Sequence, residues 1–96
     1  KDDRRTVIAH SYFVRPDQLT SYKAQGIGAS MMPPHLMLYG DQLIKYLGPE
    51  RATMESPLQS ALALGLNATL HCDYPSASPN MLESIGAAVT RTTVSG

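Results

Sequence analysis

Two short apolar segments, far apart in the sequence, each lead to a side chain that can bind a metal ion. Residues 6–9 form a largely β-branched run that ends on His10, and the run 66–70 leads through His71 to Asp73. Pro75 ends any strand two residues later. Because α/β enzymes carry their ligands and bases at the carboxyl ends of strands, this pattern predicts one site at one end of a parallel sheet.

The segment between the first two strands has the signals of a helix. Pro16 and Asp17 suit its first turn, and Gly26 suits its C-terminal cap. A strand is predicted over residues 6–13 and a second over 27–32, stopped by the Pro33-Pro34 pair. A strand–helix–strand unit of this kind connects parallel strands.

The second half of the chain repeats the alternation. We expect a loop over residues 33–39, a short helix over 41–46 and a break at Gly48-Pro49. Ser56 and Pro57 predict a helix start that runs to Gly65, followed by a strand over 68–72. Ser78-Pro79 predicts the start of a last helix. Its apolar residues recur at helical spacing: Met81, Leu82, Ile85, Ala88 and Val89.

Alternating strands and helices predict an α/β fold with a parallel sheet. Three strands alone would leave two open edges, so the count suits about three consecutive units of a (β/α)8 TIM barrel better than a finished domain. The chain begins with Lys1 rather than Met and ends at Gly96 without a helix cap. We therefore expect residues 1–96 to be a fragment of a longer protein.

Composition excludes several classes of function. The 8 basic and 8 acidic residues cancel and form no basic patch, and with one Phe, five Tyr and no Trp the chain is a poor candidate for nucleic-acid binding. No apolar run approaches the roughly 20 residues that span a bilayer. Cys72 is the only cysteine, so no internal disulfide can form. The charged run that starts at Lys1 is not followed by a signal peptide's apolar segment, and we expect a cytoplasmic protein.

Each candidate site residue also has an ordinary structural interpretation. His10 suits a strand-end histidine bonded to a carbonyl group, and Asp73 suits a turn acceptor before Tyr-Pro. His35 is equally compatible with a loop residue that has no role. His71 shares a strand face with Asp73 but reads more readily as a core histidine than as a group that supports a ligand. Cys72 is expected to be a buried structural thiol.

Several motifs resemble a known family when they are taken in order. They are Ile8-Ala9-His10-Ser11, Arg15-Pro16-Asp17-Gln18-Leu19, Gly28-Ala29-Ser30-Met31 with His35, Leu47-Gly48-Pro49-Glu50-Arg51-Ala52, Leu70-His71-Cys72-Asp73-Tyr74-Pro75 and Ala87-Ala88-Val89-Thr90-Arg91. Over nearly the whole chain this series resembles the late barrel of the amidohydrolase superfamily. Within it, the series is similar to the amidohydrolase family 3 branch, which includes enzymes like N-substituted formamide deformylase.

The resemblance implies strands six to eight of a barrel that hydrolyses C–N bonds of a small molecule with metal-activated water. His10 then matches the strand-six metal ligand. Asp73 matches the strand-eight aspartate that binds the metal and accepts the proton of the attacking water. His35, at the end of strand seven, matches a histidine that faces the substrate. The implied cofactor is a divalent metal, zinc before others.

Two departures qualify these expectations. Ala9 stands where relatives usually carry a polar residue, and the family's upstream ligands have no counterpart in this sequence. Because His10 and Asp73 are two ligands where catalytic zinc has three, we expect the fragment alone to be inactive. The alternative is a non-catalytic α/β module that self-associates through open sheet edges, and under either hypothesis we expect a homo-oligomer.

Overall fold

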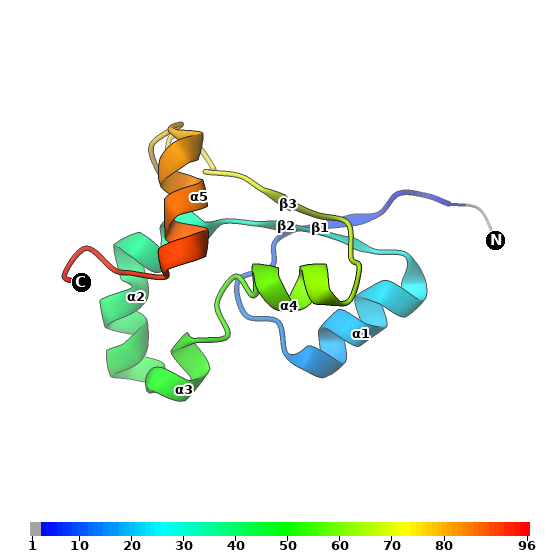
Figure 1. Ribbon diagram of the computed structural model, residues 1–96, viewed down its shortest axis with the longest axis horizontal. Helices are drawn as coiled ribbons and strands as arrows, with labels where there is room; N and C mark the ends of the chain where they lie inside the picture. Colours follow the sequence, from blue (N-terminus) through cyan, green and yellow to red (C-terminus); the bar gives the residue numbers. More distant parts are fainter. Residues whose placement is uncertain (1–2) are drawn as a thin grey trace.

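The computed structural model describes residues 3–96, so Lys1 and Asp2 of the charged N-terminal run lie outside the described residues. Strands and helices alternate along the chain (Figure 1). The elements are β1 (Val7–His10), α1 (Pro16–Gln25), β2 (Gly28–Met31), α2 (Pro33–Leu47), α3 (Pro49–Ala52), α4 (Leu58–Ala63), β3 (Ala68–Leu70) and α5 (Met81–Thr90). The predicted α/β class is confirmed.

The three strands form one parallel sheet in the order β1-β2-β3. His10 lies beside Met31 on β2, and Met31 lies beside Leu70 on β3. The carboxyl ends of all three strands therefore reach the same edge of the sheet. Helices α2 and α5 lie beyond that edge (Figure 1).

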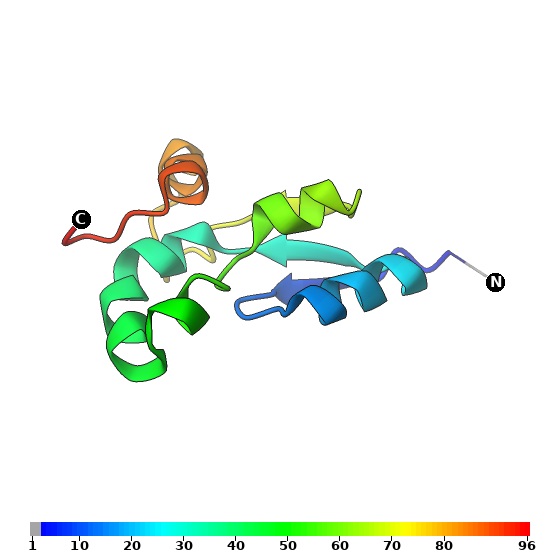
Figure 2. The same ribbon diagram turned by 60° about the horizontal axis from the view of Figure 1, so that its bottom comes forward.

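Helices α1 and α4 cover one face of the sheet (Figures 1 and 2). The core between them contains Leu19 of α1, Met31 of β2 and Ala61 of α4, each with at most 1% of its surface exposed. On the opposite face, Ala9 and Thr69 are exposed. The sheet is thus covered by helices on one side and is open at the β1 and β3 edges among the described residues.

The loop predicted over residues 33–39 is wrong, because α2 already begins at Pro33 and runs to Leu47. Both prolines occupy the first helical turn, where a backbone N–H has no partner to lose. Their rings are buried, so packing favours the helix as well. His35 consequently lies in the first turn of α2 and not at the end of a strand.

Two predicted helix starts are displaced. Helix α4 begins at Leu58, and Ser56 is buried ahead of it with φ of +44° and no capping bond. Helix α5 begins at Met81, where the Asn80 side chain accepts a hydrogen bond from the Leu82 backbone N–H at 3.1 Å. Asn is as favourable at the N-cap of a helix as Ser. The helix therefore starts after Asn80 and not after Ser78.

The apolar stripe of α5 faces outward. Leu82 and Val89 are 78% and 77% exposed, whereas Ser84 and Ala87 on the opposite face are buried. Helix α5 packs against α2, and its buried face carries the small residues Ser84 and Ala87. The spacing of the apolar residues predicted the helix correctly, but these residues do not lie on its buried face.

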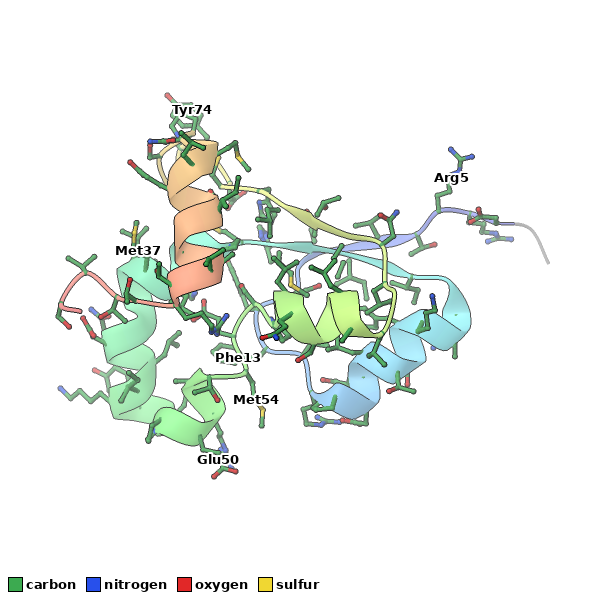
Figure 3. All side chains as sticks on the ribbon, viewed as in Figure 1. Arg5, Phe13, Met37, Glu50, Met54 and Tyr74 are labelled. Atoms are coloured by element: carbon green, nitrogen blue, oxygen red, sulfur yellow. The ribbon has the colours of Figure 1, made fainter. Side chains whose placement is uncertain are left out.

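The C-terminal segment 92–96 packs along α2. The Val94 backbone N–H donates to the Met37 carbonyl at 3.0 Å, and the hydroxyl groups of Thr93 and Ser95 donate to the Asp41 carboxylate at 2.7 and 2.8 Å. Met37 lies on the part of α2 near this segment (Figure 3). Gly40 of α2 faces segment 92–96. A Cβ atom at this position would lie 2.5 Å from Thr93 Cγ2, so any larger residue would force a shift.

No helix within residues 3–96 is both long and apolar enough to cross a membrane.

Replacing Gly40 by Ala tests whether segment 92–96 holds this position. Alanine normally stabilises a helix interior by about 1 kcal/mol over glycine. We expect Gly40→Ala to destabilise the chain instead, since the new methyl group would displace Thr93 from Asp41. Urea unfolding measures the free energy of each variant.

Gly86→Ala in α5 is the matched control, because a Cβ at Gly86 meets nothing within 4 Å. It should stabilise the chain by roughly 0.5–1 kcal/mol. Equal stabilisation by both substitutions would show that segment 92–96 does not pack on α2.

Candidate metal centre

Three metal-binding side chains meet at the carboxyl edge of the sheet. His10 is the last residue of β1, and His71 and Asp73 follow β3 directly. One ligand atom from each of the three lies within 4.8 Å of the others. His10 Nδ1 and His71 Nε2 are 3.2 Å apart. The fold therefore brings His10 and Asp73 close together, as expected, and His71 lies beside them.

The spacing and chemistry of these donors suit a small divalent metal. Two imidazole nitrogens at 2.0–2.1 Å from a tetrahedral zinc lie about 3.3 Å apart, close to the separation of His10 Nδ1 and His71 Nε2. Two imidazoles and a carboxylate are also a ligand set that zinc accepts in catalytic sites. These donors therefore fit a small divalent metal ion.

The backbone leaves regular strand geometry where these side chains are presented. His10 and Ser11 have φ of +66° and +44°, and Asp73 has φ of +55°. Such values are uncommon outside glycine and cluster at functional sites. The turn after β1 is held by the Ser11 side chain, whose hydroxyl donates to the Ile8 carbonyl at 3.1 Å. A matching turn follows β3, where the Ser76 N–H donates to the Asp73 carbonyl at 2.7 Å.

The environment of His71 favours its neutral form. Desolvation by burial lowers the pKa of His71, electrostatic interaction with the neighbouring His10 lowers it further, and the Asp73 carboxylate opposes both effects. A neutral imidazole has the lone pair that a metal requires. His71 is not the fully buried core histidine that was expected, since it is half-buried and its ring lies 4.9 Å from the His10 ring between centres.

His35 is outside this group of ligands, and Tyr12 lies between them. The Tyr12 ring stacks on His10 at 5.2 Å between ring centres and on His35 at 4.2 Å. Tyr39 covers His35 from α2 at 4.8 Å. Burial raises the pKa of Tyr12, and the negative charges of Asp73 and Glu55 add to the increase. One aromatic ring thus contacts both the metal-binding group and the His35 side chain.

Glu55 and Arg91 were not identified from the sequence. Glu55 is completely buried between α3 and α4, and one of its carboxylate oxygens bonds His35 Nδ1. The Arg91 guanidinium donates to the Glu55, Thr53 and Ser56 carbonyls at 2.6, 3.2 and 3.3 Å. No local sequence pattern marks Glu55, because its partners come from the segment between β1 and α1, from α2 and from the end of α5. Arg91 is the last residue of the motif Ala87-Ala88-Val89-Thr90-Arg91, but the sequence assigned it no role.

The whole chain, residues 1–96, matches the profile of the Amidohydrolase family. This chain belongs to the amidohydrolase family. It is also 41% identical over 91 residues to the "Protein LONG AFTER FAR-RED 3" of Arabidopsis thaliana. That match covers 93% of the chain but only 15% of the relative's length. No solved structure matches the chain.

Membership in the amidohydrolase family agrees with the fold. An open sheet of three parallel strands that alternate with helices is consistent with part of an amidohydrolase barrel. The ligand atoms of the metal-binding group lie where barrel enzymes carry their active sites, at the carboxyl ends of the strands.

Stability should depend on pH through Glu55. Burial raises the pKa of its carboxyl group above the ordinary value of 4.5, although His35 and Arg91 partly oppose the increase. Between the ordinary and the raised value, the folded chain binds the proton and the unfolded chain does not. The free energy of unfolding should therefore fall as pH rises through this window. Urea unfolding at a series of pH values measures the slope.

Glu55→Gln should remove most of that slope, because the amide does not titrate. Glu50→Gln changes an exposed glutamate of α3 that points away from the fold (Figure 3) and should leave the slope intact. A slope that survives in Glu55→Gln would show that another group is responsible.

Proposed function

We propose that this chain supplies part of the active site of a metal-dependent hydrolase that cleaves C–N bonds with activated water. Membership in the amidohydrolase family supports hydrolysis as the reaction. The single observation that carries the proposal is the convergence of His10, His71 and Asp73 at the carboxyl edge of the sheet.

In this proposal, the imidazoles of His10 and His71 and the carboxylate of Asp73 hold a divalent cation, zinc before others. The bound metal would supply an acidified water and polarise the scissile carbonyl group. The sequence alone offered two ligands, and the position of His71 brings the number of donors to the three that catalytic zinc uses.

Asp73 is the proposed proton acceptor. It is exposed, so a water molecule can reach its carboxylate, and the turn after β3 fixes its backbone. A carboxylate beside a metal-activated water can orient it and take its proton. His35, on the other side of Tyr12, is proposed to contact the substrate.

The substrate class follows from the resemblance to family 3 enzymes. We propose a small molecule with a hydrolysable C–N bond, with the chain forming strands six to eight of the barrel. The match covers only 15% of the curated relative's length. On that basis we propose that the complete enzyme needs further segments and that these 96 residues alone are inactive. The location proposed for the complete enzyme is the cytoplasm, as we expect from the sequence.

Zinc titration calorimetry tests the metal centre. Each of His10→Ala, His71→Ala and Asp73→Ala removes one donor and should weaken binding at least tenfold, since even supporting residues of metal sites contribute 10–100-fold. His35→Ala is the matched control, because His35 is a half-buried histidine outside the group of ligands. Its affinity should equal that of the wild type. Equal affinity in all five proteins would overturn the proposed centre.

A second function, self-association through the open sheet edges, is favoured by the exposure of β1. Val7 and Ile8 on this edge strand are 54% and 37% exposed. Edge strands with exposed apolar side chains pair with other chains. We propose that copies of the chain pair along β1.

Multi-angle light scattering should then give a mass above the 10.4 kDa of one chain. Ile8→Lys places a charge on the edge strand and should shift the mass toward that of the monomer. Leu62→Lys changes an exposed leucine of α4 and should leave the mass unchanged. A monomeric wild type at high concentration contradicts self-association.

A further inference from the structure

The His35 ring packs against two tyrosine rings and bonds a carboxylate, and one edge of the ring is left free for a ligand. Tyr12 stacks on the ring at 4.2 Å between centres, with 27° between the planes, and Tyr39 lies against it at 4.8 Å. Glu55 bonds its Nδ1 atom. The nitrogen left for a ligand is Nε2, and the side chain is 21% exposed.

The buried position of the Glu55 carboxylate is energetically unfavourable, and packing alone does not require it. Its side chain is completely buried, and its second carboxylate oxygen, Oε2, has no hydrogen-bond partner among the described residues. Arg91 lies close by, yet its guanidinium donates to three backbone carbonyls and not to this carboxylate. Burying a carboxylate without full pairing is unfavourable. Among the described residues, the one hydrogen bond that the Glu55 side chain makes is to His35.

The backbone around Glu55 is held in place from both sides of the chain. The Ser56 N–H donates to the Tyr12 carbonyl at 2.7 Å, and Glu55 pairs with Phe13 as an isolated antiparallel bridge. Phe13 lies beside this segment (Figure 3). The carboxylate is therefore fixed relative to the turn that carries Tyr12 and follows His10.

We propose that Glu55 is a positioning residue that keeps the proton of His35 on Nδ1 and leaves Nε2 as a hydrogen-bond acceptor. A carboxylate that accepts the Nδ1 proton sets the tautomer of a neutral imidazole. His35 would then select a ligand that donates a hydrogen bond, such as the N–H of a secondary amide. The choice of ligand rests on the proposed hydrolytic function, whereas the position of the proton on His35 does not.

Nitrogen-15 NMR of the histidine rings tests the proposal, because the chemical shifts separate a protonated ring nitrogen from an unprotonated one. The spectra are recorded at about pH 8, where an unperturbed histidine is neutral and an unperturbed glutamate is ionised. In the wild type we expect His35 Nδ1 to be protonated and Nε2 to be unprotonated. In Glu55→Leu, which is similar in size and apolar, we expect loss of this preference and a shift of the proton to Nε2.

Glu50→Leu is the matched control, since Glu50 is an exposed glutamate of α3, and its His35 shifts should equal those of the wild type. A purely structural Glu55 would lower the stability of the Leu variant without moving the proton. If Glu55→Leu does not fold, the wild-type spectrum still decides: a proton on Nε2 of His35 overturns the proposal.

Zinc titration of the same samples separates this inference from the proposed function. Glu55→Leu should bind zinc as the wild type does, because Glu55 is not among the grouped ligands. Zinc binding together with a proton on Nε2 would overturn the inference alone. The expected His35 tautomer without any zinc binding would overturn the metal centre and leave the role of Glu55 standing.

Discussion

Parallel pairing through the central strand β2 is the constraint on which the site depends. Two crossover connections, one through α1 and one through α2 to α4, return the chain to the same end of the sheet each time. The pairing continues beyond β3, where the His71 N–H donates to the Met31 carbonyl at 2.9 Å. All three strands must therefore end at one edge. Residues distant in the sequence, His10 and Asp73, become neighbours because of this backbone register and not because of any attraction between their side chains.

The parts of the fold that the sequence predicted well are those with local signals. A β-branched run predicts β1, and Gly26 ends α1 in the left-handed conformation that its lack of a side chain allows. Helix α2 was predicted in part because a proline pair is compatible with a loop and with a first helical turn. In the folded chain both rings are buried, and this burial is a tertiary effect that the local sequence does not show.

The same distinction applies to the candidate site. His10 and Asp73 follow recognisable strands, so their convergence could be predicted, although their chemical roles stay predictions. His71 was assigned to the core because alternation along a strand does not tell which face is covered. Glu55 could not be found from sequence, since its burial and its bond to His35 arise from elements brought together only by the complete fold.

The position of Tyr12 has a consequence for how this site can change. Its ring touches His10 on one side and His35 on the other, so both histidines share one packing partner. Residues that share a partner show non-additive energies when both are altered. The packing of His10 and the packing of His35 are therefore not independent of each other. A substitution at Tyr12 would remove a packing partner from both histidines at once, so neither ring can lose this neighbour alone.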